Sequence, residues 1–99
     1  MIKVLVGYKL KEGANIDSTL VKFRSHAMQY KGFIGAENLC NAKDNSVVAM
    51  VTTWERLEDW SAWEKSKVRE QLLQKVSTLL KEEPRVTIYE IIPTVRWVG

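Results

Sequence analysis

The chain has 99 residues and a net charge of +3, with 45% hydrophobic and 27% charged residues. This length suits one domain with a modest core, so residues 1–99 are expected to form a single domain that association would stabilise. The composition excludes a disordered chain, and no apolar run approaches the roughly 20 residues of a membrane span. The lone Cys40 excludes an intrachain disulfide and a cysteine metal cluster. Since no signal-peptide pattern opens the chain, we expect a cytoplasmic protein with no membrane partner.

The first part of the chain predicts a strand followed by a helix. Residues 2–10 place apolar side chains at every second position, which is typical of a strand with one apolar face. Asn15 or Asp17 can cap a helix that runs to about Tyr30. Within it, apolar residues recur at spacings of 4, 3, 4 and 3 and form one stripe, namely Ile16, Leu20, Phe23, Ala27 and Tyr30.

The middle of the chain predicts a β-hairpin. Residues 33–42 and 46–54 flank Asp44-Asn45, where we expect a tight turn. The second strand is apolar on both faces and therefore belongs in the middle of a sheet that is covered on both sides. Its interior carries no aromatic residue for base stacking, so no nucleic-acid partner is expected.

Residues 57–80 have helical periodicity, but the apolar stripe changes direction. An α-helix turns by about 100° per residue, and on this basis the two parts of the stripe point in directions more than about 100° apart around the helix axis. One straight helix therefore cannot bury both parts against one sheet. We therefore predict a kink or break near Ser66. Pro84 then precedes a last strand at residues 85–93. The two stripes are Leu57, Trp60 and Trp63, followed by Val68, Leu72, Val76 and Leu79.

The resulting order is βαββαβ, which predicts an α+β ferredoxin-like plait: an antiparallel sheet with helices on one face. The other face would also be apolar, because Leu5, Leu39 and the third strand contribute hydrophobic side chains to it. A monomer rarely exposes so large an apolar surface. We therefore expect a two-fold homodimer that stacks sheet against sheet.

The histidine and the tryptophans are the first candidates for a functional site. His26 is the only histidine and is either a surface or packing residue or a proton acceptor at the mouth of a gap between helix and sheet. We expect Trp54 and Trp60 to belong to the core, whereas Trp63, beside the predicted break, would edge a pocket. Trp97 is expected to pack on a neighbouring surface such as the partner subunit.

Three segments resemble the antibiotic-biosynthesis-monooxygenase-like (ABM) family of dimeric α+β barrels. They are KEG after the opening strand, YKGFIGAEN at the end of the first helix and W-E-x-x-E-D-W-x-x-W-x-x-S after the third strand. The resemblance covers essentially the whole chain. It implies a homodimer whose sheets form a barrel, with a pocket between helices and sheet in each subunit. Similar proteins include cofactor-independent oxygenases that turn polycyclic phenols into quinones, quinol oxygenases and haem-degrading enzymes.

The haem-degrading branch can be compared position by position. It uses an asparagine on the first strand, a tryptophan after the WE segment, and a histidine ten residues beyond that tryptophan as iron ligand. Trp63 matches the tryptophan, but Leu73 stands at the histidine position and Val6 or Gly7 at the asparagine position. Because leucine cannot ligate iron, haem degradation is not expected. Phe23 matches a ligand-contacting aromatic of that branch, yet its place in the helical stripe favours a core role.

The resemblance favours a small monooxygenase that uses no cofactor or metal and acts on an aromatic or quinone-like substrate. A base would generate the phenolate that reacts with oxygen, and His26 is the side chain suited to that role. Two alternatives are a non-catalytic dimeric barrel that binds a planar hydrophobic ligand and a domain whose tryptophans only stabilise the fold. Tyr8 and Tyr89 are equally explained as packed strand residues. The expected substrate-binding residues are Trp63, Tyr8, Tyr30, Asn38 and Tyr89.

Overall fold

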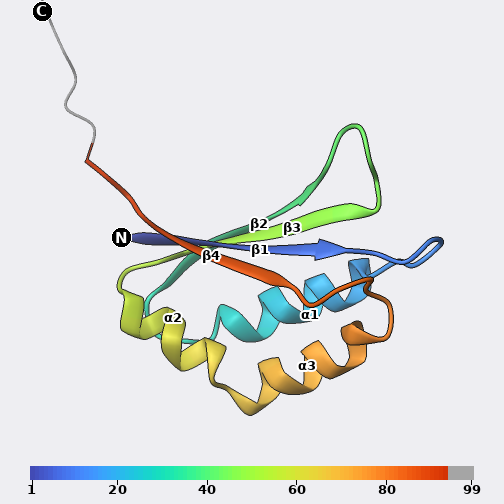
Figure 1. The fold of residues 1–99 in the computed structure, drawn as a ribbon. Coiled ribbons are helices and arrows are strands. Elements are labelled where there is room, and N and C mark those ends of the chain that lie inside the picture. Colours follow the sequence, from blue (N-terminus) through green and yellow to red (C-terminus); the bar gives the residue numbers. More distant parts are fainter. Residues whose placement is uncertain (94–99) are drawn as a thin grey trace, which may run out of the picture.

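A computed structural model describes residues 1–93 of the chain. These residues form an α+β fold with the expected element order, and the prediction for Trp97 lies outside them (Figure 1). None of the helices in this part of the chain is long and apolar enough to cross a membrane. The elements are β1 (Ile2–Lys9), α1 (Asp17–Ala27), β2 (Phe33–Cys40), β3 (Val47–Trp54), α2 (Leu57–Glu64), α3 (Lys67–Ser77) and β4 (Arg85–Glu90).

The strands form one antiparallel sheet in the order β2-β3-β1-β4, which is the ferredoxin-like arrangement. β3 and β1 occupy the middle, as the apolar character of both faces of β3 predicted. In their register Val4 lies opposite Thr52 and Val6 opposite Met50. These side chains therefore share one face, because directly opposed residues of an antiparallel pair point the same way.

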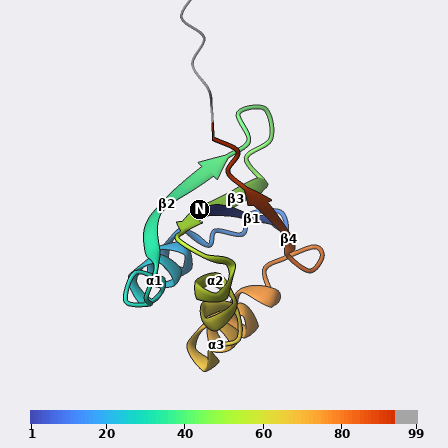
Figure 2. The same ribbon diagram turned by 90° about the vertical axis from the view of Figure 1, so that its left-hand side faces the viewer.

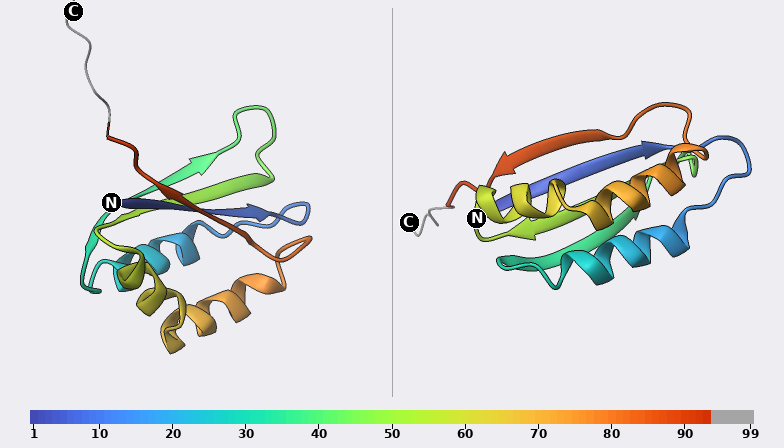
Figure 3. Two further views of the ribbon diagram at one scale, coloured as in Figure 1. Left: turned by 60° about the vertical axis from the view of Figure 1, so that its left-hand side comes forward. Right: turned by 90° about the horizontal axis from the view of Figure 1, so that it is seen from below.

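All three helices lie on one face of the sheet, below it in Figure 1, and α1 runs beside α2 and α3 across that face when seen from below (Figure 3). The core lies between these two layers. Every second residue of β1 faces it, and α1 contributes Leu20, Phe23 and Ala27. This confirms the predicted helical stripe, whose last member, Tyr30, follows the helix and is partly buried.

The long helical segment is broken where its stripe changes direction. α2 ends at Glu64 and α3 starts at Lys67, with Ser66 in an extended conformation at the α3 N-cap. The Ser66 Oγ accepts a hydrogen bond from the Arg69 N–H at 3.2 Å. The break lets both stripes face the sheet: α2 buries Trp60 and Trp63, and α3 buries Leu72 and Val76.

The predicted turn at Asp44-Asn45 is confirmed within a longer loop that joins β2 to β3: the Val47 N–H donates to the Asp44 carbonyl at 3.1 Å and closes a four-residue turn. Residues 41–46 form this loop, and two polar side chains organise it. The Asn41 Oδ1 accepts hydrogen bonds from the N–H groups of Lys43 and Asp44, and the Asp44 Oδ1 accepts from the Ser46 hydroxyl at 2.6 Å. Asn and Asp commonly organise turns in this way. Because β2 ends at Cys40 and β3 begins at Val47, the loop around the turn is longer than the sequence predicts.

The opposite face of the sheet carries no helix, as the view from the side shows (Figure 2). Leu5, Ala49 and Val51 lie half-buried on it, while Leu39 and Tyr89 are 47% and 54% exposed. The apolar second face that the sequence predicts is therefore present, and no other element of residues 1–93 covers it.

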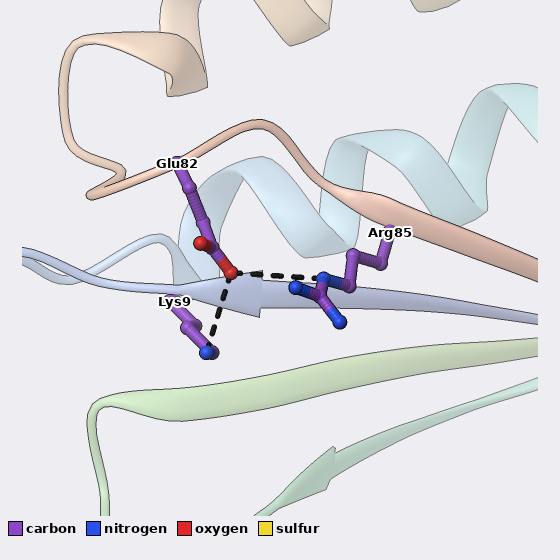
Figure 4. Close-up of polar contacts among 3 residues, drawn as sticks. All are labelled: Lys9, Glu82 and Arg85. Atoms are coloured by element: carbon purple, nitrogen blue, oxygen red, sulfur yellow. Dashed lines mark ion pairs between the residues drawn. The ribbon is translucent and has the colours of Figure 1, made fainter.

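An ion-pair cluster joins the start of β4 to the end of β1. The Glu82 carboxylate lies 3.3 Å from the Lys9 Nζ and 3.8 Å from the Arg85 Nε (Figure 4). All three side chains are substantially exposed. Such surface pairs contribute at most about 1 kcal/mol each, so this cluster helps to align β4 more than it stabilises the fold.

Candidate functional site: the interior aromatic cluster

Aromatic side chains from five elements and one connection meet between the sheet and the helices. Trp54 is central, with its ring centroid 5.4 Å from that of Phe33 and 6.2 Å from that of Trp60, both in edge-on geometry. The Trp54 Nε1 donates to the Thr52 Oγ1 at 2.9 Å, so this indole is fully partnered. The interior aromatic cluster consists of Tyr8, Phe23, Tyr30, Phe33, Trp54, Trp60 and Trp63.

Trp63 packs against Tyr30, which lies between α1 and β2. Their centroids are 5.3 Å apart with an interplanar angle of 65°, and Trp63 is only 2% exposed. Asp59 precedes Trp63 by four residues on α2, so both lie on the same side of that helix. The Asp59 Oδ2 is fully enclosed and has no hydrogen-bond partner among residues 1–93. An acceptor without a donor thus lies one helical turn before the buried Trp63 on α2.

Gly32 makes room for the Asp59 carboxylate. Gly32 has a φ of +82°, and a Cβ at this position would overlap the Asp59 side chain. Glycine therefore satisfies two demands here, a left-handed backbone and an absent side chain. The carboxylate is held against the backbone that links α1 to β2.

A second group of polar side chains surrounds Trp60. The Arg69 guanidinium carbon lies 5.2 Å from the centroid of the Trp60 ring, and Arg69 is 7% exposed. Burial lowers the pKa of Arg69, an effect that Tyr8 and Glu64 oppose. Burial also raises the pKa of the Tyr8 hydroxyl to about 12, although the positive charge of Arg69 counteracts part of the rise.

The structure does not bring His26 to Trp63. His26 is exposed on α1 and lines an open groove of about 670 Å³ between α1 and α3. Lys22 and Lys75 flank this groove, and Leu72 forms part of its floor. Its role as a base stays a prediction.

The remaining predicted site residues are dispersed. Tyr8 is 2% exposed and lies 6.5 Å from Phe23 between the ring centroids. Asn38 lies on the helix-facing side of edge strand β2, opposite Met50, but is exposed. Tyr89 is opposite Lys3 and points to the open face of the sheet. Within one subunit, only Tyr30 and Trp63 of the six candidates form a direct aromatic pair.

A separate hollow of about 700 Å³ lies at the far end of the sheet, between the loop after β1 and the β2–β3 loop. None of the predicted site residues lines it, and its walls are mainly loop residues such as Lys11, Glu12 and Asn45. Residues 1–93 contain no group of three or more His, Cys, Asp or Glu side chains that could hold a metal ion.

Sequence reasoning missed Asp59 and Arg69 as polar residues of the interior. Asp59 directly follows Glu58, and Arg69 lies within a run of mixed charges; both patterns are typical of an exposed helix face. The available signal was the spacing: Asp59 is four residues before Trp63, and Arg69 is three before Leu72, so each shares a side with a buried residue. The periodicity analysis counted only apolar residues and therefore passed over both.

The fold and this interior cluster define a ferredoxin-like α+β protein whose core between sheet and helices is rich in aromatic side chains. The family model for antibiotic biosynthesis monooxygenase matches residues 1–75, and the chain belongs to this ABM family. No curated protein matches the sequence significantly.

Solved structures have the same fold at low identity. A candidate antibiotic biosynthesis monooxygenase from Deinococcus radiodurans is 14% identical with a TM-score of 0.85, and the match covers 100% of both chains. A similar candidate from Nitrosomonas europaea is 14% identical with a TM-score of 0.84, over 94% of this chain and 100% of that one. SnoaB from Streptomyces nogalater, described as a cofactor-independent oxygenase, is 9% identical with a TM-score of 0.83, over 95% of each chain.

Proposed function

We propose that this protein is a monooxygenase of the ABM type that oxidises an aromatic or quinone-like substrate without a cofactor. Membership of the ABM family and the fold shared with SnoaB support the reaction class. The observation that carries the proposal is the Tyr30–Trp63 pair together with the unpartnered Asp59 Oδ2, which lies one helical turn before Trp63 on α2. Such a combination supplies what a phenol needs: aromatic surfaces and an acceptor for its hydroxyl proton.

The reaction requires little from the protein besides binding and proton transfer. Removing the hydroxyl proton gives an electron-rich phenolate, which reacts with dioxygen. One oxygen atom becomes the new quinone oxygen and the other leaves as water, while the substrate itself supplies the electrons. A positioned acceptor for the proton contributes typically 10²–10⁴-fold to such a step, in order of magnitude.

Asp59 and His26 are the two candidate acceptors. The Asp59 oxygen is enclosed one helical turn before Trp63, whereas His26 lies at the surface groove between α1 and α3. In the proposal Tyr30 and Trp63 hold the substrate ring and Asp59 accepts the hydrogen bond of its hydroxyl. His26 would act only on a substrate that extends into the groove.

We also propose a homodimer through the open face of the sheet. Its apolar residues, including Leu39 at 47% and Tyr89 at 54% exposure, support this arrangement. Stacking a second copy there would bury them and would give Tyr89 a partner surface. Light scattering should then show twice the 11.4 kDa mass of one chain; a monomer at micromolar concentration would contradict the dimer.

Oxygen consumption and tryptophan fluorescence, followed together, test the activity. We expect an anthrone to quench the fluorescence and to consume one dioxygen per quinone formed. Asp59→Asn should lower the rate by about 10²-fold or more, if Asp59 handles the proton. Glu58→Gln, which neutralises the exposed neighbouring carboxylate, should not change the rate.

Other outcomes separate the alternatives. Quenching without oxygen uptake would identify a protein that only binds planar ligands. Loss of activity in His26→Ala but not in Asp59→Asn would move the base to the groove. If no compound changes either signal, the tryptophans serve the fold alone and the proposal fails.

A further inference from the structure

We propose that Arg69, Tyr8 and Trp60 form a subsite for one anionic group, a carboxylate or phenolate oxygen, on the aromatic ligand. The inference rests on the proposed function because it names the class of substrate that the interior cluster accepts: an aromatic compound with a negative charge. The inference rests on three side chains whose hydrogen-bond donors have no acceptor among residues 1–93.

Arg69 is a buried cation without a counter-ion. It is 7% exposed, and its guanidinium takes part in no ion pair or side-chain hydrogen bond among residues 1–93. The only carboxylate that noticeably affects its charge is Glu64, which is exposed and is not an ion-pair partner. A charge that is mostly buried is costly to leave unpaired, so Arg69 is suited to a ligand that supplies the missing anion.

Two further donors lie with the guanidinium. The Trp60 Nε1 is fully enclosed and unpartnered, and it belongs to the ring over which Arg69 stacks. Tyr8 is 2% exposed and forms no hydrogen bond through its hydroxyl among the described residues. It is also close enough for the charge of Arg69 to influence its pKa. Three donors with no acceptor match an oxygen-rich anionic group.

The position of Arg69 in its helix strengthens the local positive potential. Ser66 is the N-cap of α3, so Arg69 lies in the first turn, where the helix dipole is positive. A cation at this end is unfavourable for the helix itself. The same potential favours a bound anion, and it acts together with the buried guanidinium rather than replacing it.

The geometry also favours a planar anion. The Trp60 ring fixes the guanidinium from one side, and a fixed guanidinium pairs best with the two oxygens of a carboxylate. Because Trp60 and Trp63 lie three residues apart on α2, the anionic subsite adjoins the aromatic pair that would hold the ring of the same ligand.

A matched pair of ligands tests this subsite independently of oxidation. Naphthalene-2-carboxylate and naphthalene-2-carboxamide have the same ring and nearly the same shape, but only the first is charged, and neither has a phenol to oxidise. Measured by tryptophan fluorescence, the wild-type protein should bind the carboxylate at least about tenfold more tightly, as expected for a hydrogen bond to a charged group. Equal affinities would overturn the proposal.

Variants assign the preference to Arg69. Arg69→Met should abolish the preference for the carboxylate and leave the carboxamide affinity unchanged. Lys67→Met, which removes an exposed positive charge from the same helical turn, should retain it. Arg69→Lys keeps the charge without the planar group and provides a second variant if Arg69→Met does not fold; its preference should be smaller than that of the wild type. If Arg69→Met or Arg69→Lys binds the carboxylate over the carboxamide with the same preference as the wild type, the proposal is also overturned.

The two proposals fail separately. A carboxylate preference that depends on Arg69 would establish the subsite even if no substrate consumed oxygen. Oxygen uptake without any carboxylate preference would leave the monooxygenase and remove the anionic subsite.

Discussion

The two faces of the sheet are built from the same strands but are used differently. On the helix-facing side, Val4 and Trp54 are 0% exposed, and the helices close the core over them. On the other side, Leu5 and Val51 alternate with those residues and have no cover within the described chain. Alternation places apolar groups on both faces, but one subunit has helices for only one.

The difference extends to polar side chains. The closed side contains Arg69, the Asp59 carboxylate and the Trp60 N–H without partners, although it is the best-packed part of the molecule. Unpartnered polar groups lower stability and are concentrated at functional sites in many proteins. The residues that stabilise the fold and those of the candidate site thus lie on the same, helix-facing side of the sheet. The apolar open side is suited to association with another subunit.

Trp54→Ala should have the largest effect on the closed face. Trp54 is fully buried between Phe33 and Trp60 and donates to Thr52, so its removal leaves a cavity and an unused acceptor. We expect a loss of about 3–5 kcal/mol in the free energy of unfolding, measured by urea denaturation.

Val51→Ala provides the comparison on the open face. In an isolated subunit the half-buried Val51 should contribute little, and its truncation should cost about 1 kcal/mol or less. A larger loss that depends on protein concentration would show that this face is buried in an oligomer. Equal losses at both positions in a monomer would refute the distinction between the faces.

Tyr8 should make the closed face sensitive to alkaline pH. The native protein keeps the Tyr8 proton up to a pKa of about 12, whereas the unfolded chain releases it near 10.0. The contribution of the protonated Tyr8 hydroxyl to the free energy of unfolding is therefore intact below pH 10.0 and is lost as the pH rises towards about 12. The total is roughly 2–3 kcal/mol, since one pKa unit corresponds to about 1.4 kcal/mol.

Tyrosinate absorbance measures this effect directly. One tyrosine should ionise only as the pH approaches about 12, and this late transition should be missing in Tyr8→Phe. Stability measured at pH 9 and pH 11 should also fall less in Tyr8→Phe than in the wild type. A single tyrosine transition near the ordinary pKa would contradict the burial of this hydroxyl.

Ser66→Ala should have the smallest of these effects. Removing the N-cap oxygen leaves the Arg69 N–H without its acceptor and should cost about 1 kcal/mol. Ser77→Ala is a suitable control because the Ser77 hydroxyl only donates to the Gln74 carbonyl near the exposed end of α3. If both variants lose equally little stability, the cap does not fix the helix break.

Much of the fold could be predicted because local patterns agree with it. The period of two in β1, the stripe of α1 and the change of stripe direction near Ser66 each follow from side-chain spacing. The turn at Asp44-Asn45 could be predicted, but the length of the β2–β3 loop around it could not, since the side-chain oxygens of Asn41 and Asp44 accept hydrogen bonds that organise it. Family membership likewise followed from short motifs.

The candidate site was less accessible to this reasoning. The sequence by itself determined the strand and helix faces, the helix break and the presence of buried tryptophans, because hydrophobic periodicity reflects which side of an element avoids water. Only the tertiary structure decided that His26 lies in a surface groove, that Trp63 pairs with Tyr30, and that Arg69 lies over Trp60. Those relations depend on how separate elements pack, and no local pattern specifies which polar side chain will be left inside without a partner.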